Sequence, residues 1–237
     1  MSSLQKMGGV AALIGAATYV VGFVLLFGLL VPAGYGSGDG SAVQSVAFLA
    51  DHQAILYTWN LIIYVVFGVF LVVLALALHE RFKAGSPAVV QTATAFGIIW
   101  AGLVIASGMV ANVGMDTVVD LFGKDQAQAA SVWLALESVQ NGLGGGIEIV
   151  GGLWVLFISF AALRTGGLPR ALNYLGVVIG AAGILTIVPV LEVVAAFFGL
   201  GFIVWFVWVG IVMLRGGSDA ASKADGSLES ATSFASN

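Results

Sequence analysis

Long apolar stretches dominate the pattern of this chain, and short polar segments separate them. Six of the stretches have about 20 residues or more, the length that crosses the roughly 30 Å hydrocarbon core of a bilayer. They cover residues 9–31, 54–78, 91–113, 143–163, 171–190 and 194–214. The last two form one nearly continuous run. We expect this run to fold back at Pro189 and Glu192, because Pro interrupts a helix and Glu prefers the interface. The pattern predicts an all-α, polytopic bundle of six transmembrane helices over residues 9–214.

The connections between the stretches differ in length and in character. Residues 32–41 are rich in Gly and Ser, which is typical of a flexible turn. Residues 126–141 have mixed polarity, and they fit either an interfacial helix or an extension of the fourth span. Residues 1–8 form a short N-terminal segment. Residues 215–237 are rich in Ser, Ala, Gly and Asp, and this composition predicts a disordered tail.

The composition agrees with a membrane protein and excludes several other classes. The chain is 60% hydrophobic and 8% charged, whereas a soluble domain has about 45–50% apolar and about 25% charged residues. It has no cysteine, which excludes thiolate chemistry and Cys-ligated metals or haem. Its two histidines, His52 and His79, lie about 40 Å apart if the second span is a straight helix. We therefore expect no metal site and no cofactor.

The charges predict partners and orientation. A net charge of −4 gives no basic surface for nucleic acid, so the expected partner is the lipid bilayer. Lys and Arg gather on the cytoplasmic side of a membrane. With six spans and the N-terminus inside, Lys124 is the only basic residue outside. The other seven are Lys6, Arg81, Lys83, Arg164, Arg170, Arg215 and Lys223. We expect a multi-pass protein of a bacterial-type inner (plasma) membrane with both termini in the cytoplasm.

One acidic residue lies within a predicted span. Glu148 is flanked by glycines at 144–146 and 151–152. An ionisable group inside a span is costly, which makes it a candidate functional residue. If one helix runs through, Glu137 and Asn141 share its face, and the three groups together could bind a cation or relay a proton. The alternative is that Glu148 reaches the outer headgroups or accepts one interhelical hydrogen bond.

A second group of polar residues lies on the second span. Tyr57, Asn60 and Tyr64 follow the i, i+3, i+7 spacing of one helix face, and they could line a polar cavity. The alternative is an aromatic belt at the interface with one hydrogen-bonding Asn. Asn112, at the outer end of the third span, could join the group around Glu148.

Small and aromatic residues predict how the helices pack. The chain has 33 glycines, which suits closely packed membrane helices. Gly176 and Gly180 form a Gly-x-x-x-Gly pattern, which favours a close helix–helix contact. Such faces could also support a homo-oligomer. Trp205 and Trp208 are typical of an aromatic anchor at the membrane interface.

The turn between the fourth and fifth spans carries a resemblance to a known family. The residues are Arg164-Thr165-Gly166-Gly167-Leu168-Pro169-Arg170, followed by an apolar span. This segment resembles a family of small bacterial six-span membrane proteins known only as a domain of unknown function, in which a hydrophobic-Pro-Arg turn joins these spans. The match would cover most of residues 8–214. In that family Leu-Gly is expected directly after Pro-Arg, whereas here Leu175-Gly176 comes later. The resemblance implies fold and topology, and it implies no activity.

Three functional hypotheses remain at this level. The first is a non-catalytic packing or regulatory membrane protein, with a homo-oligomer formed through Gly-rich faces. The second is a transporter of a small solute or ion, proton-coupled, that uses Glu148 with Asn60 and Glu137. The third is an intramembrane enzyme, for which the sequence offers neither a metal cluster nor a Ser–His pair. The sequence does not identify a substrate.

Overall fold

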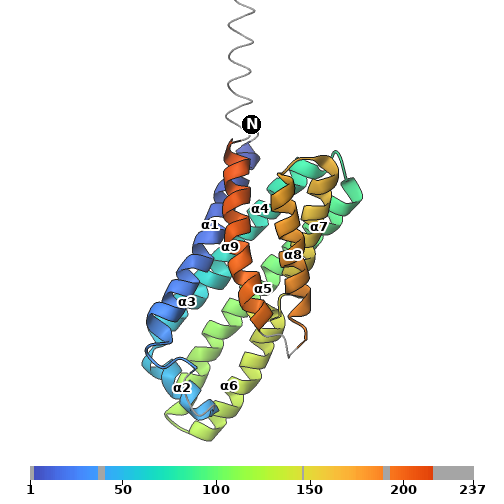
Figure 1. Ribbon diagram of the computed structural model, residues 1–237. Coiled ribbons are helices and arrows are strands. Elements are labelled where there is room, and N and C mark those ends of the chain that lie inside the picture. The colour runs from blue at the N-terminus through green and yellow to red at the C-terminus, as the bar shows by residue number, and fades with distance from the viewer. Residues whose placement is uncertain (1–2, 37–40, 146, 189–192, 216–237) are drawn as a thin grey trace, which may run out of the picture.

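The regular elements of this chain are all helices in the part that the structure describes. The computed structural model covers residues 3–36, 41–145, 147–188 and 193–215 (Figure 1). The turn expected at Pro189 and Glu192 and the tail after residue 215 lie outside these residues. The elements are α1 (Ser3–Leu25), η1 (Leu26–Leu30), α2 (Ala42–Asp51), α3 (Gln53–Asn60), η2 (Leu61–Val66), α4 (Phe67–Phe82), α5 (Pro87–Phe122), α6 (Gln126–Gln140), η3 (Asn141–Gly145), α7 (Ile149–Thr165), α8 (Arg170–Leu185) and α9 (Val193–Arg215), where η marks a π-helix. The predicted all-α fold is confirmed.

Five helical stretches in the described residues are long and apolar enough to cross a membrane. They are Ser3–Leu30, Gln53–Phe82, Pro87–Phe122, Gln126–Thr165 and Val194–Arg215. The fifth predicted span corresponds to α8, which has 16 residues and is therefore about 24 Å long. It is shorter than the hydrocarbon core of a typical bilayer. The chain is thus a membrane protein, and its described part has five candidate spanning helices and two shorter apolar helices, α2 and α8.

The main core of the bundle is aromatic. The long helices pack in neighbouring pairs, among them α1 with α4 and α9, and α7 with α5 and α8. Trp154 lies at the centre, with its ring centroid 5.6 Å from those of Trp100 and Trp205. The prediction that Trp205 anchors the protein at the membrane interface is wrong, because this side chain is fully buried. Its face of α9 points into the bundle, where Phe202 and Phe206 surround it.

A second, smaller core lies at the other end of the bundle, and we call this region the cap. The cap consists of α2, α3, α6 and residues 115–122 of α5 (Figure 1). The helix that contains the third predicted span, 91–113, continues well beyond it, because α5 has 36 residues and extends about 54 Å. Its last turns pack Met115 and Val118 against Trp133 of α6.

Two side-chain caps explain why polar stretches of the cap form helices. Ser41 accepts a hydrogen bond from Gln44 N at the start of α2, at 3.3 Å, and Asp125 accepts one from Gln128 N at the start of α6, at 2.9 Å. Residues 126–140 therefore form a separate helix, which leads into α7 through a break. At that break, Gly144 has a φ of 120°.

The opposite end of the bundle carries most of the basic residues, and we call it the basic end. It includes the start of α1, the connections α4–α5 and α7–α8, and the end of α9. The Met213 side chain of α9 packs beside Gly8 of α1. Arg81 joins three of these segments, because its guanidinium donates to Gly167 O at 2.8 and 3.2 Å and to Gln5 Oε1 at 3.0 Å.

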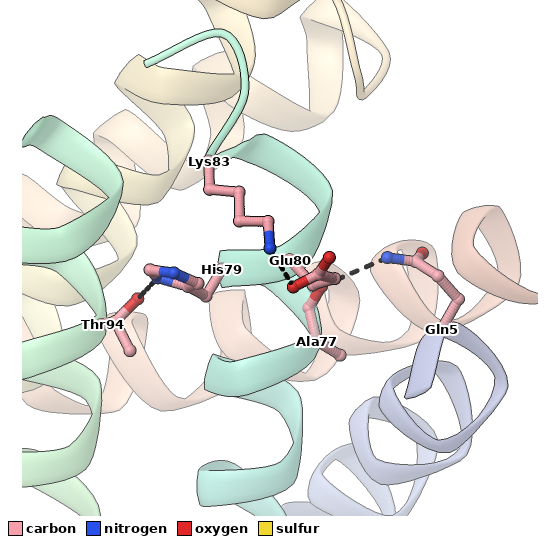
Figure 2. A network of polar contacts seen from close by, with 6 residues as sticks. All are labelled: Gln5, Ala77, His79, Glu80, Lys83 and Thr94. Atoms are coloured by element: carbon pink, nitrogen blue, oxygen red, sulfur yellow. Dashed lines mark hydrogen bonds and ion pairs between the residues drawn. The ribbon is translucent and has the colours of Figure 1, made fainter. Parts of the chain in front are cut away.

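Neighbouring polar contacts tie the same helices together (Figure 2). Gln5 reaches from α1 and donates to Ala77 O of α4 at 3.2 Å. His79 of α4 points toward Thr94 of α5, with Nδ1 and Oγ1 2.8 Å apart. Lys83 pairs with Glu80 at 2.8 Å, but both side chains are about half exposed. The basic end is thus a set of interhelical contacts as well as a group of charges.

We expect Arg81→Ala to destabilise the protein more than Lys83→Ala, although each variant removes one positive charge. Loss of the Arg81 contacts should lower the free energy of unfolding by about 1–3 kcal/mol. Loss of the exposed Lys83–Glu80 pair should cost about 0–1 kcal/mol. Thermal unfolding of the purified variants in detergent measures the difference. Equal destabilisation would contradict the structural role of Arg81.

Glycines allow α7 and α8 to approach closely. A Cβ at Gly180 would lie 2.8 Å from the carbonyl oxygen of Gly152, and a Cβ at Gly176 would overlap Ser159 Oγ. Both glycines of the Gly-x-x-x-Gly pattern therefore face a neighbouring helix of the same chain. Their role in the structure is the internal α7–α8 contact.

We expect Gly180→Ala to lower the free energy of unfolding by about 1–3 kcal/mol, because a new methyl group meets a backbone atom that cannot move aside. Gly102→Ala is the matched control. A Cβ at exposed Gly102 meets nothing within 4 Å, so this change should stay within about 1 kcal/mol and favour the helix. Thermal unfolding checks both, and a neutral Gly180→Ala would refute the close contact.

Candidate functional site

Glu148 lies where the chain changes from the break after α6 to the first turn of α7. Its backbone N–H donates to Thr186 Oγ1 at 2.8 Å, and the Thr186 hydroxyl donates to Gly183 O at 2.7 Å. The carbonyl of Glu148 accepts from Gly152 N at 2.8 Å, which starts the α7 helix. The backbone of Glu148 is therefore held by the end of α8. Its side chain is held less firmly: the Trp100 indole lies near enough to interact with the carboxylate, but the buried Oε2 has no hydrogen-bond partner of good geometry.

A cavity of about 170 Å³ lies beside this carboxylate, and we call it the Glu148 chamber. Six aromatic rings line it: Tyr19, Phe23, Trp59, Tyr64, Phe67 and Trp100. The Trp59 indole donates to Gly22 O at 3.1 Å, which holds α3 against α1. The buried Nε1 of Trp100 has no hydrogen-bond partner. The chamber thus combines aromatic walls with one unpartnered carboxylate oxygen.

All three π-helical segments of the described chain meet at this chamber. Leu26 belongs to η1, Ile63 and Tyr64 to η2, and Gly144 and Gly145 to η3, and each lines the cavity. A π-helix has one extra residue per turn, so it loosens the hydrogen bonding of a helix and is common at functional sites. Three separate helices therefore depart from α geometry at the same place.

Two further cavities continue from the chamber toward the cap. The first, the neck, has a volume of about 140 Å³ and shares Trp59, Tyr64 and Gly145 with the chamber. The second, the vestibule, has about 470 Å³ and shares Tyr35, Leu49, Trp133 and Glu137 with the neck. The shared lining residues show that the three cavities are neighbours, and we call them together the series.

The charged residues that line this series are almost all acidic. Glu148 lines the chamber, Glu137 lines both the neck and the vestibule, and Asp51 lines the vestibule. The described lining residues include neither Lys nor Arg, and His52 is the only histidine among them. Burial, with a smaller contribution from Glu137, raises the pKa of Tyr35 above its ordinary value. The Tyr35 phenol therefore stays neutral, and the carboxylates decide the charge of the series.

Toward the basic end, the aromatic core closes the series. Trp100 lines the chamber on one side and stacks against Trp154 and Phe202 on the other. A Cβ at Gly151 would lie 2.6 Å from the Trp100 ring, so the indole fills the space directly beside the first turn of α7. Trp100 therefore separates the chamber from the aromatic core on this side.

The polar residues singled out from the sequence lie at different points of this series. Asn60 is buried and lines the neck, where it donates to Asn112 Oδ1 at 3.1 Å. Asn112 donates to the Tyr57 carbonyl at 3.3 Å, but the Tyr57 side chain is 45% exposed. Tyr64 accepts from Gln140 Nε2 at 3.4 Å. The π-helix η2 begins directly after Asn60 and changes the helical register. Tyr64 therefore lines the neck together with Asn60, whereas Tyr57 does not.

The acidic residues are also arranged differently from a single helix face. Glu137 and Asn141 line the neck, whereas Glu148 lines the chamber. The break at Gly144 ends the helix between them. The prediction that Glu137, Asn141 and Glu148 share one helix face required an uninterrupted helix. It is therefore wrong. These groups lie along a path and do not form one cluster. The described residues contain no group of three or more His, Asp or Glu side chains that could hold a metal ion.

The comparison with protein families agrees with this architecture. Residues 7–214 match the family described as a domain of unknown function (DUF4386). The chain belongs to this family. The resemblance inferred from the turn at residues 164–170 is thus confirmed at the level of the family, and the match covers the whole bundle and the cap. No curated protein and no solved structure matches the chain.

Sequence reasoning missed the aromatic walls of the chamber. Tyr19 and Trp100 belong to helices that are largely apolar on every side, so their hydrophobic pattern does not distinguish a cavity wall from a lipid-facing position. One feature could have helped. Gly22, Gly144 and Gly145 are the small residues among the lining set, and each stands within five residues of an aromatic or ionisable side chain.

We expect a cysteine at Tyr64 to react with a membrane-impermeant thiol reagent added on the cap side, because this position lines both the chamber and the neck. The natural chain has no cysteine, so single-cysteine variants need no background changes. Mass spectrometry of the labelled protein measures the reaction.

Two serine-to-cysteine variants serve as the accessible and the inaccessible control. Ser131→Cys on exposed α6 reports free access from the cap side, and Ser159→Cys, 1% exposed within α7, reports the closed core. Tyr64→Cys should label like the first and unlike the second. Protection of Tyr64→Cys at the level of Ser159→Cys would contradict a path from the cap.

Proposed function

We propose that this protein is a membrane transporter that binds a small solute at Glu148 and admits it from the cap side. The observation that carries the proposal is the buried, unpartnered Oε2 of Glu148 beside an aromatic chamber. A carboxyl group without a partner inside a membrane protein costs several kcal/mol. An apolar side chain at this position would avoid that cost. The group is best explained by a guest or a proton that occupies the site during function.

The broken helices support transport over static binding. Transporters place substrate sites where discontinuous helices meet near the middle of the membrane. Here η1, η2 and η3 and the Gly144 break all lie at the chamber. Weakened helix geometry at one level would allow the cap-side segments η1, α3 and α6 to move relative to the aromatic core. Release toward the basic end would in turn need Trp100 to move away from Trp154 and Phe202.

The topology that fits this function has six crossings, with α8 as the short fifth crossing, in a bacterial plasma membrane. Both termini then lie in the cytoplasm at the basic end, since this end carries Lys6, Arg81, Arg164 and Arg215. The cap, the vestibule and Lys124 lie outside. Solute would enter from the external side and leave toward the cytoplasm, or travel in the reverse direction by exchange.

A purely structural role is less well supported. The glycines that suggested a packing protein are used inside the chain, where Gly176 and Gly180 contact α7. That contact leaves the Glu148 chamber unexplained. An intramembrane enzyme has no observation in its favour, because the described residues that line the chamber include no Ser, Thr, Cys, His or Lys.

We expect Glu148→Gln to abolish solute flux. The amide carries no negative charge, so it can neither pair with a cation nor take up and release a proton. Membrane vesicles carrying the protein would be assayed for untargeted metabolite accumulation and for proton flux. Glu80→Gln is the matched control, since Glu80 is an exposed glutamate at the basic end. Thermal unfolding of each variant confirms that folding is intact.

The proposal predicts at least one metabolite, or a proton current, that depends on wild-type protein, persists in Glu80→Gln and falls to background in Glu148→Gln. An identical metabolite profile and proton flux in wild-type and Glu148→Gln vesicles would refute a transport role for this site.

A further inference from the structure

We infer that the solute bound in the Glu148 chamber is a small organic cation, an ammonium group carrying short apolar substituents. This inference rests on the proposed function and specifies its substrate class. It is carried by three features of the chamber: its charge, its aromatic walls and its size.

The charge of the chamber favours a cation. Among the described residues that line the chamber, Glu148 is the only one with a carboxyl group, and none is Lys, Arg or His. An anionic solute would lose its hydration without gaining a counter-charge, and the carboxylate would repel it. Both effects raise the free energy of its transfer from water. A cation supplies the counter-charge that the protein itself does not offer to Glu148.

The aromatic walls favour an organic cation over a hydrated inorganic ion. Tyr19 and Phe67 meet edge to face at 5.2 Å between ring centroids, and Phe67 meets Trp100 at 5.4 Å. With Phe23, Trp59 and Tyr64, these rings surround the space beside Glu148. Ring faces attract a cation within about 6 Å, and aromatic cages recognise ammonium groups. A metal ion would instead need several oxygen ligands, and the chamber offers one carboxylate and two phenols.

The same walls disfavour a neutral polar solute such as a sugar, which needs many hydrogen-bonding groups. Few are free in the chamber. The Trp59 N–H already donates to Gly22 O, and the Tyr64 hydroxyl already accepts from Gln140. The remaining polar groups of the side chains are the carboxylate, the Tyr19 hydroxyl, the Trp100 N–H and the O–H of Tyr64, which can still donate. This set orients one charged group and leaves the rest of the guest in apolar surroundings.

The size of the chamber limits the guest to a few heavy atoms. Its volume is about 170 Å³, and a cavity of about 150 Å³ accommodates benzene. A quaternary ammonium ion with a short side chain falls in this range. The approach to the chamber suits such an ion as well, since Asp51 and Glu137 line the vestibule and attract cations.

The experiment compares two probes of equal shape that differ in charge. Choline has a quaternary nitrogen where 3,3-dimethyl-1-butanol has a carbon atom. Binding of each is measured by isothermal titration calorimetry on the full chain in nanodiscs of zwitterionic lipid. We expect choline to bind about tenfold or more tightly than the alcohol. Equal affinities, or no binding of choline at millimolar concentration, would overturn the inference.

Two pairs of variants test which groups are responsible. Glu148→Gln should lower choline affinity about tenfold or more, and Glu80→Gln should leave it unchanged. Phe23→Leu should weaken choline several-fold, because Phe23 lines the chamber. Phe27→Leu is its control, since Phe27 stacks on Phe23 at 6.0 Å but is 64% exposed and lines no part of the chamber. Equal effects within either pair would count against a cation held in the chamber.

The failure of the substrate class can be separated from the failure of the proposed function. If vesicles accumulate an anionic or neutral solute in a Glu148-dependent way, the transport function stands and the organic cation is wrong. If choline binds in a Glu148-dependent way but no solute or proton flux depends on Glu148, the cation site stands and the transport function is wrong.

Discussion

A carboxylate that lies among apolar side chains has to be met by a hydrogen-bond donor, a cation or a proton. This constraint acts at Glu148, and much of the bundle is arranged around it. The end of α8 holds the backbone of Glu148 through Thr186, and the side chain is left without a partner for its buried oxygen. Aromatic rings line the cavity beside it. The position of this one group links the break before α7, the chamber and the proposed ligand.

The two ends of the bundle are built on different physical principles. At the basic end, Arg81 and Gln5 connect three segments by hydrogen bonds, and α7 and α8 touch through glycine backbones. Such contacts tolerate little movement. At the cap end, three π-helices, the Gly144 break and a series of cavities leave the packing looser. The proposed transport function would use this difference, because alternating access moves one part of a bundle against another around a central site.

The membrane class and the location of the key carboxylate could be predicted from the sequence. Stretches of about 20 apolar residues have few stable structures other than helices in lipid, so the all-α class follows from composition. Glu148 was identified because a lone charge in such a stretch is conspicuous. The boundaries were less predictable. The α5 helix continues to Phe122 because α6 covers its last turns, and α8 ends at Leu185, short of the expected span.

What the sequence determined by itself was therefore one-dimensional: which segments are apolar, where the few charges lie, and that Glu148 lies within an apolar stretch. The tertiary structure decided which of the apolar side chains face each other. Tyr19, Trp59 and Trp100 come from three helices and converge on Glu148, and Trp205 turns out to be buried in the core. The physical reason is that a helix that is apolar all round carries no pattern that distinguishes lipid, core and cavity. Only packing against the other helices makes that distinction.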